Sequence, residues 1–427
     1  MSSTSHGKKQ WDSRWDSLPR EIRLLITQYL IQDGCPLAPF ATVSREMQTD
    51  IERHNFARIR LTPSRLANFR AMIQRIRGLV GYIWFCLELD EYDCTACPPP
   101  SGPSTSYEFT EGLEISGTDK CPITASFQDL FSVLGEWKPH GDLTLDISLY
   151  SPSDSEHWFP YLTFLPDNPP NMPADHAVEN ASRKYHDPEH GWSNGLRHLA
   201  SPPWALRKLF HLITEQGPHD SDQEELDWWD QLPSVPAVTS LLLRQQNCRR
   251  WKPVSLAHMF ARFPRLQELH YEPWREWDDW GRALQIEILT PDKVDSTGIG
   301  ALLLVTAAAA EKMPRLETMD IWNGRKGLAA LFRYQVFRNE GEAVFTWRGT
   351  LELAMELAVI QAWQAVTKQY DVLRLNVAVE RLDGTIIRSH GVAIQHLGLS
   401  GQVIRPVSLQ QIQMEQEALE GVATVES

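Results

Sequence analysis

Apolar side chains first form a helical pattern close to the beginning of the chain. Five of them recur at the i, i+3, i+4, i+7 and i+8 spacing of one helix face, namely Ile22, Leu25, Ile26, Tyr29 and Leu30. Ser17 is expected to cap the first turn, and Pro19 suits a turn whose N–H groups have no helical partner. Gly34 and Pro36 predict the end of this helix.

A second helical pattern follows within a few residues. Its apolar stripe is formed by Phe40, Val43, Met47 and Ile51, and charged residues occupy the other side. A core made by such short helices is small, so we expect the module over residues 11–60 to be marginally stable alone. Packing on a partner or on the rest of the chain should stabilise the module.

Two short motifs within these helices resemble an F-box. The first is Leu18-Pro19-Arg20-Glu21-Ile22 and the second, at the right separation, is Val43-Ser44-Arg45. F-box segments dock on the Skp-type adaptor of cullin-RING ubiquitin ligases, so the resemblance implies that adaptor as a partner. Carried over position by position, the resemblance assigns adaptor binding to nine residues, namely Leu18, Pro19, Glu21, Ile22, Ile26, Leu30, Val43, Ser44 and Arg45.

Two positions depart from the F-box motif. Thr27 stands where the motif often has phenylalanine, and Met47 stands where it often has tryptophan. The alternative is therefore a protein-interaction scaffold whose F-box-like helices no longer bind the adaptor. A plainer reading is an amphipathic helix that packs on the body of the protein.

Beyond the module, helical and strand-like stretches alternate. The helical stretches 63–76, 127–137, 256–263, 302–313 and 351–367 each precede a short run typical of a strand. Such alternation predicts an α/β protein. Near the carboxyl terminus, apolar runs on both sides of residues 339–342 predict a hairpin.

Three of the junctions between helix and strand share one local sequence pattern. A proline follows the last helical residue in Val235-Pro236, Phe263-Pro264 and Met313-Pro314, and a strand-like run begins shortly afterwards. Self-similarity of this kind indicates a repeat, and one helix per parallel crossover gives an α/β solenoid. The segment Leu266-Gln267-Glu268-Leu269-His270-Tyr271 resembles a divergent leucine-rich repeat.

We therefore predict an irregular leucine-rich-repeat-like α/β solenoid over residues 61–405, with insertions at about 98–122 and 151–200. An ordinary doubly wound α/β domain is the alternative. Residues 1–10 are expected to be a disordered tail, and residues 406–427 a helix that frays into a tail.

Charge and cysteine content narrow the class of partner and the compartment. The net charge of −14 argues against nucleic acid and anionic membrane surfaces as partners, because phosphate binding needs clustered Lys and Arg. The six cysteines are irregularly spread, which favours reduced thiols and an intracellular, cytoplasmic or nuclear protein. The longest apolar run, 299–310, is too short for a membrane span of about 20 residues and predicts a buried helix.

Three motifs suggest chemistry, and each lacks its structural context. Gly191–Gly195 fits the nucleophile elbow Gly-x-Ser-x-Gly, but no apolar strand precedes it. His186–His190 fits His-x-x-Glu-His, but Pro188 within that turn costs a helix about 3 kcal/mol. Cys94 and Cys97 have zinc-ligand spacing, but no second close pair follows. We therefore predict no catalytic residue, no metal and no cofactor.

These patterns together predict a non-enzymatic substrate-recognition subunit of an SCF-type ubiquitin ligase. In that resemblance the opening module binds the adaptor, and the strand face of the body or its tryptophan-rich insertions bind an unknown target protein. Those tryptophans are Trp228, Trp229, Trp274, Trp277 and Trp280. They fit equally well as aromatic cover for the edge of the body. The chain resembles the expanded F-box-like proteins of filamentous fungi, specifically over about its first fifty residues.

Overall fold

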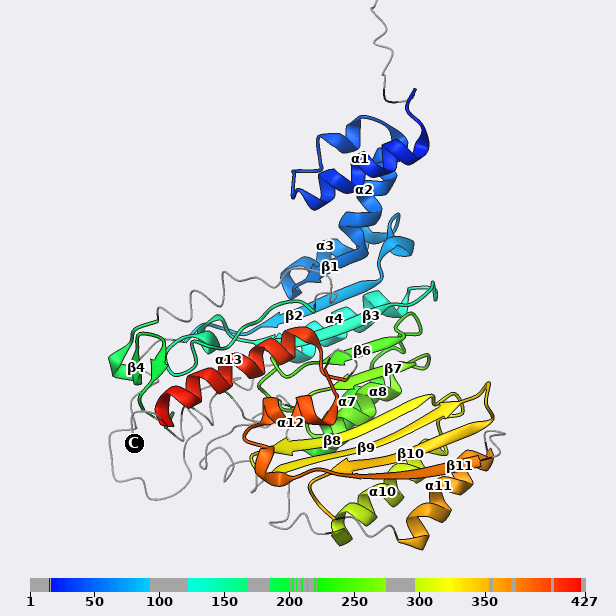
Figure 1. Ribbon diagram of the computed structural model, residues 1–427. Coiled ribbons are helices and arrows are strands. Elements are labelled where there is room, and N and C mark those ends of the chain that lie inside the picture. Colours follow the sequence, from blue (N-terminus) through cyan, green and yellow to red (C-terminus); the bar gives the residue numbers. More distant parts are fainter. Residues whose placement is uncertain are drawn as a thin grey trace, which may run out of the picture.

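The computed structural model describes the chain from the start of the predicted module to its last helix, with gaps (Figure 1). The described residues are 15, 17–92, 122–167, 185–199, 201–202, 205, 209, 213, 219, 221–273, 296–352, 356–369, 374–400 and 403–423. A small helical module stands at one end, a parallel sheet lies in the middle, and a second sheet with two helices on its outer side closes the other end.

The helices of the module begin and end near the predicted residues. They are α1 (Arg20–Gln32), η1 (Phe40–Thr42) and α2 (Arg45–Ala57). Gly34, with φ +68°, follows α1 and confirms its predicted end. Pro19, and not the predicted Ser17, is the N-cap residue, and the Pro19 side chain makes no capping hydrogen bond. The Pro19 carbonyl instead accepts the N–H groups of Ile22 and Arg23.

A parallel sheet of five strands follows in chain order. Its strands are β1 (Arg58–Leu61), β2 (Tyr82–Glu88), β3 (Thr144–Tyr150), β6 (Ser240–Leu243) and β7 (Glu268–Tyr271). Every neighbouring pair is parallel, which confirms the predicted α/β class. Because a doubly wound sheet reverses its strand order and this one does not, the doubly wound alternative does not describe it.

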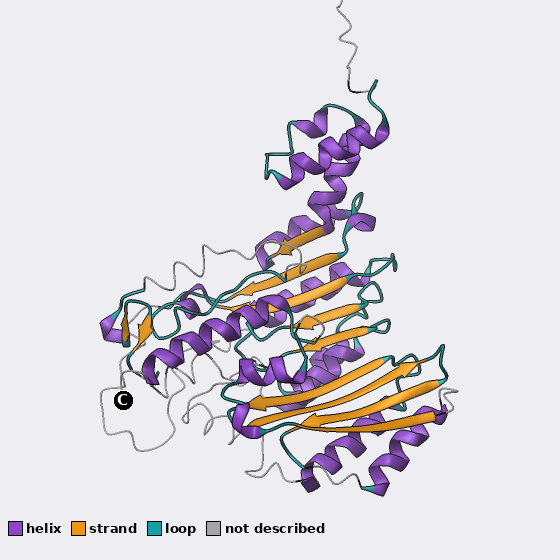
Figure 2. Ribbon diagram, in the orientation of Figure 1, coloured by secondary structure: helices purple, strands orange, loops and turns teal. Residues whose placement is uncertain are grey.

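One face of this sheet carries the helices and the main apolar core (Figure 2). The helices are α3 (Pro63–Ile73), α4 (Pro122–Gly135), α7 (Asp222–Gln231) and α8 (Pro253–Ala261), with the 3-10 turn η2 (Arg77–Leu79) before β2. The alternate strand residues Ile83 and Phe85 point into this core together with Phe127 and Trp229. Crossovers between neighbouring parallel strands thus bury one continuous apolar layer.

The other face of the sheet is covered by the chain itself. Residues 161–167 lie against it, where the Phe164 ring stacks on Tyr150 at 4.4 Å. Helix α13 (Pro406–Ala423) packs on that segment, since Gln411 Oε1 accepts the backbone N–H of Thr163 at 2.8 Å. We call residues 161–167 and α13 the cover. The strand face that was expected to hold a target protein is therefore occupied by the cover.

A second sheet of four strands has its own core. Its strands are β8 (Thr318–Arg325), β9 (Leu328–Phe337), β10 (Glu342–Gly349) and β11 (Arg374–Arg381). Helices α10 (Ser296–Ala310) and α11 (Leu357–Gln369) pack on one side around Trp363, and α12 (His390–Leu397) packs on the other after the turn η6 (Gly384–Ile386). The predicted hairpin is confirmed, with Gly341 at φ +65° in its turn.

The strand predicted after residues 302–313 does not continue the parallel series. It forms β8, which pairs antiparallel with β9 through a tight turn at Gly327, so the repeat prediction is wrong there. The shared proline junctions do form one common turn, in which the residue before proline accepts an N–H from three residues on. These bonds join Val235 to Val238, Phe263 to Leu266, and Met313 to Leu316.

Helix α10 is buried on one side only. Leu303 is 1% exposed, whereas Leu302 and Val305 are 48% and 69% exposed, so the predicted buried helix is buried along one side and open along the other. Among the described residues, no helix combines the length and the apolar character needed to cross a bilayer.

A small lobe lies beside one end of the cover. It contains η4 (Pro152–Ser155), η5 (Pro188–His190) and the short hairpin of β4 (Trp192–Ser193) and β5 (Leu196–Arg197). Its aromatic residues Phe159, Tyr161 and Trp192 pack together with Met414 of α13.

Candidate functional site

Helix α1 turns an apolar face away from the rest of the molecule. Ile22, Leu25 and Tyr29 are 42%, 48% and 69% exposed, and their i, i+3, i+7 spacing puts them on one side of the helix. We call these three residues the outer face. The module stands at the top of Figure 1, beyond the end of the parallel sheet. An apolar helix face open to water is typical of a protein-interaction site.

The joint between α1 and α2 holds this face outward. On the inner side of α1, Thr27 is 3% exposed and Arg23 Nη2 lies 2.7 Å from Glu46 of α2. Arg23 Nη1 also donates to the Leu18 carbonyl at 3.1 Å. Met47 of α2 is 2% exposed. The joint therefore combines a small apolar contact with an ion pair, and it uses none of the outer face.

Ser44 has a structural role in the module. Its Oγ accepts the backbone N–H of Met47 at 3.1 Å and so caps α2, and Trp15 Nε1 donates to the same oxygen at 3.1 Å. Val43, just before the cap, is 46% exposed.

The nine residues assigned through the resemblance divide between surface and joint. Five are exposed, namely Pro19, Glu21, Ile22, Val43 and Arg45, and four are half-buried, namely Leu18, Ile26, Leu30 and Ser44. Motif matching omitted Leu25 and Tyr29, which the helical periodicity had identified. The two departures from the motif, Thr27 and Met47, are buried in the joint, so neither interrupts the outer face.

The motif Gly191–Gly195 forms a hairpin turn. Ser193 pairs with Leu196, and the residues between them, Asn194 and Gly195, have φ of +52° and +80°. Positive φ at both central positions is the type I′ arrangement that the Asn-Gly pair favours. The strand-turn-helix geometry of a nucleophile elbow is absent from this described segment, although Ser193 Oγ lies 3.5 Å from His186 Nδ1.

The motif His186–His190 does not form the α-helix that a zinc peptidase needs. Pro188 begins the three-residue turn η5, as its ring favours. His186 is exposed, whereas His190 is 5% exposed and pairs with Asp187. Cys94 and Cys97 lie outside the described residues, as do Trp274, Trp277 and Trp280. Trp229 is 1% exposed within the main core, which is a packing role.

Comparisons with known proteins add one finding. The profile of a family of unknown function, DUF6546, matches residues 207–405. That stretch includes β6, β7 and the second sheet, and it leaves out the module that carries the outer face. No match was found among curated proteins or solved structures.

Proposed function

We propose that this protein is the substrate-recognition subunit of an SCF-type ubiquitin ligase. The outer face binds a Skp-type adaptor, and the body binds a target protein. The observation that carries the proposal is the exposure of Ile22, Leu25 and Tyr29 on a helix that begins with the F-box-like Leu18-Pro19 pair. Burying such side chains contributes about 1.5–3 kcal/mol each when they become fully buried.

The central sheet supports the body of the proposed architecture. Five parallel strands in chain order, with their helices on one face, fit a leucine-rich-repeat-like solenoid to which the second sheet is appended. Because the cover occupies the strand face, we assign target binding to surfaces of the body outside that face. The ligase chemistry then belongs to partner proteins.

Co-purification with a recombinant Skp-type adaptor tests the proposal. The wild-type chain should retain the adaptor, and Leu25→Glu combined with Tyr29→Glu should weaken binding by about 30-fold or more, as loss of interface hot spots does. Both side chains are exposed in the free protein, so the substitution should leave the fold intact. Leu18→Asp with Pro19→Ala should also abolish binding, but Leu18 contributes to the joint and its variant needs a folding check.

Met72→Glu on α3 is the matched control. Met72 is 68% exposed on the neighbouring helix, so replacing an exposed apolar side chain by glutamate there should leave adaptor binding unaltered. If the wild-type chain fails to retain the adaptor under conditions where an established F-box protein does, the ligase proposal is wrong. The protein-interaction scaffold would then replace it.

A further inference from the structure

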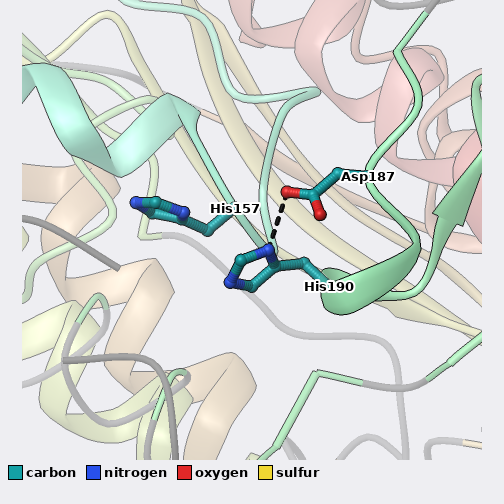
Figure 3. A group of neighbouring side chains, drawn as sticks. All are labelled: His157, Asp187 and His190. Carbon is teal, nitrogen blue, oxygen red and sulfur yellow. Dashed lines mark hydrogen bonds and ion pairs between the residues drawn. The ribbon is translucent and has the colours of Figure 1, made fainter. Parts of the chain in front are cut away.

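Three side chains that commonly bind metals meet in the small lobe (Figure 3). They are His157, Asp187 and His190, and one potential ligand atom from each lies within 4.8 Å of the others. For three atoms this close there is always a point within about 2.8 Å of all of them, whereas zinc–imidazole bonds are about 2.0–2.1 Å. Side-chain shifts of less than about 1 Å would therefore bring all three atoms to bonding distance.

Asp187 and His190 already bring two potential ligand atoms together. His190 Nδ1 lies 2.7 Å from Asp187 Oδ2, and Tyr185 donates its hydroxyl to the same oxygen at 3.3 Å. When Nδ1 gives up its proton, its lone pair can bind a metal beside the carboxylate oxygen. Because metal ligands must be deprotonated, a metal ion would replace the proton that these two atoms share.

The backbone fixes the direction of His157. Its φ is +54°, a left-handed conformation that is uncommon outside glycine and that persists only where the surroundings enforce it. The preceding turn η4 is held by a capping box between Ser151 and Asp154, and Asp154 forms a buried ion pair with Arg249. The His157 and His190 rings lie 4.9 Å apart as a result.

We propose that His157, Asp187 and His190 bind one zinc ion. Two imidazoles and one carboxylate suit zinc, whereas magnesium and calcium prefer all-oxygen ligand sets. Glu156, whose Oε2 is 3.6 Å from His157 Nε2, or a water molecule completes the tetrahedron. The ion links η4 to η5 and so fastens the two parts of the small lobe.

The sequence motif pointed to a different ligand set. His-x-x-Glu-His pairs His186 with His190, but His186 is exposed and lies outside the cluster. The fold supplies His157 instead, from the other side of residues 168–184. Spacing along the chain could not indicate such a site.

Zinc binding by the full-length chain tests the proposal. The protein carries Cys94→Ser and Cys97→Ser, which removes the only close pair of cysteines in the sequence, and is stripped with a chelator. We expect one zinc ion per chain on titration, and cobalt substitution should give a spectrum without thiolate charge-transfer bands. His157→Gln and His190→Gln should each weaken zinc binding at least about 100-fold, beyond the 10–100-fold typical of outer-shell changes.

His186→Gln is the matched control and should bind zinc like the parent protein. Zinc should also raise the Tm of the parent and leave that of His157→Gln unchanged, while equal metal-free Tm values show that the variant folds. The proposal is overturned if the parent binds no zinc, if folded His157→Gln binds it equally well, or if His186→Gln loses as much affinity.

Discussion

The amino-terminal module and the central sheet place polar and apolar side chains in opposite ways. In the module, the Arg23–Glu46 ion pair lies in the joint while Leu25 and Tyr29 face outward. In the sheet, the face opposite the helices carries Asp146 and Arg244, which are fully buried beneath the cover. Within the described residues, the chain covers the face where charge is buried and leaves the apolar face of α1 uncovered.

This difference indicates which surface is available for binding. Arg244 Nε lies 2.9 Å from Asp146 Oδ2, and Arg244 Nη2 donates to the Leu165 carbonyl of the cover at 2.9 Å. Tyr82 donates to the same carboxylate, and burial together with that charge raises the pKa of Tyr82, which keeps its proton in place. A buried network of this kind is stable only when every member keeps its partner. The middle of the strand face is therefore covered, whereas the outer face remains open.

Breaking the buried Asp146–Arg244 pair should have the largest effect on the free energy of unfolding. Arg244→Met leaves Asp146 buried without its partner, and we expect a loss of about 3–5 kcal/mol in the free energy of unfolding. Urea unfolding followed by tryptophan fluorescence measures it. Arg381→Ala is the control, because the Arg381–Glu352 pair is 3.7 Å apart and 70% and 81% exposed, and its loss should cost at most about 1 kcal/mol.

The double variant Asp146→Leu with Arg244→Met separates lost pairing from lost packing. Replacing both charges by apolar groups should recover much of the stability that Arg244→Met loses. If the single and double variants lose the same free energy of unfolding, the unpaired charge of Asp146 is not the cause of the loss.

A substitution in the joint of the module should have the next largest effect on stability. Met47 is 2% exposed, so Met47→Ala should destabilise the module by about 2–5 kcal/mol. Leu25→Ala, on the outer face, should change stability by no more than about 0.5 kcal/mol. Hydrogen exchange of α2 amides reports the difference, with amides of β2 as the internal reference. If Leu25→Ala lowers the protection of α2 as much as Met47→Ala does, the outer face is not free.

Periodicity predicted the module because its helices are local structures. The apolar spacing of Leu25 and Tyr29 identified α1, and Gly34 identified its end. Which side of α1 would be buried could not be predicted, since Arg23 and Thr27 form the inner side and look polar in the sequence. A helix with an apolar stripe normally buries it, and only the tertiary contacts show otherwise.

The body shows where local sequence resemblance stops being informative. The proline turns at Phe263 and Met313 are alike, yet one leads into parallel β7 and the other into antiparallel β8. A turn fixes how a strand begins, but its partner depends on the residues that follow, here the Gly327 turn. In the small lobe, the Asn194-Gly195 pair inside the Gly-x-Ser-x-Gly match is itself typical of a hairpin turn, and that turn is what forms.

The smallest effect on stability is expected at the edge of the central sheet, where β7 meets the segment before α13. His270 Nε2 lies 2.7 Å from Glu268 Oε1, and His270 Nδ1 lies 3.4 Å from the Val403 carbonyl just before α13. The hydrogen bond to His270 lowers the pKa of Glu268. Burial alone would lower the pKa of His270, but its hydrogen bond to Glu268 and the charge of that carboxylate raise it, even against nearby Arg405.

These shifts set the pH range in which the pair stabilises the edge. The contribution of Glu268 is present above its ordinary pKa of 4.5 and is lost as the pH falls through the lowered value. The contribution of His270 is present below its ordinary pKa of 6.5 and is lost as the pH rises through the raised value. The pair should therefore stabilise the fold most between about pH 4.5 and 6.5.

His270→Gln tests this window. Because the Glu268 side chain is 58% exposed, we expect the variant to be less stable than wild type by only about 0.2–1 kcal/mol near pH 5.5. The difference should shrink as the pH rises through the raised pKa of His270. Urea unfolding at a series of pH values from 5.5 upward measures it, and a difference that stays constant would show that the Glu268–His270 ion pair does not stabilise this edge.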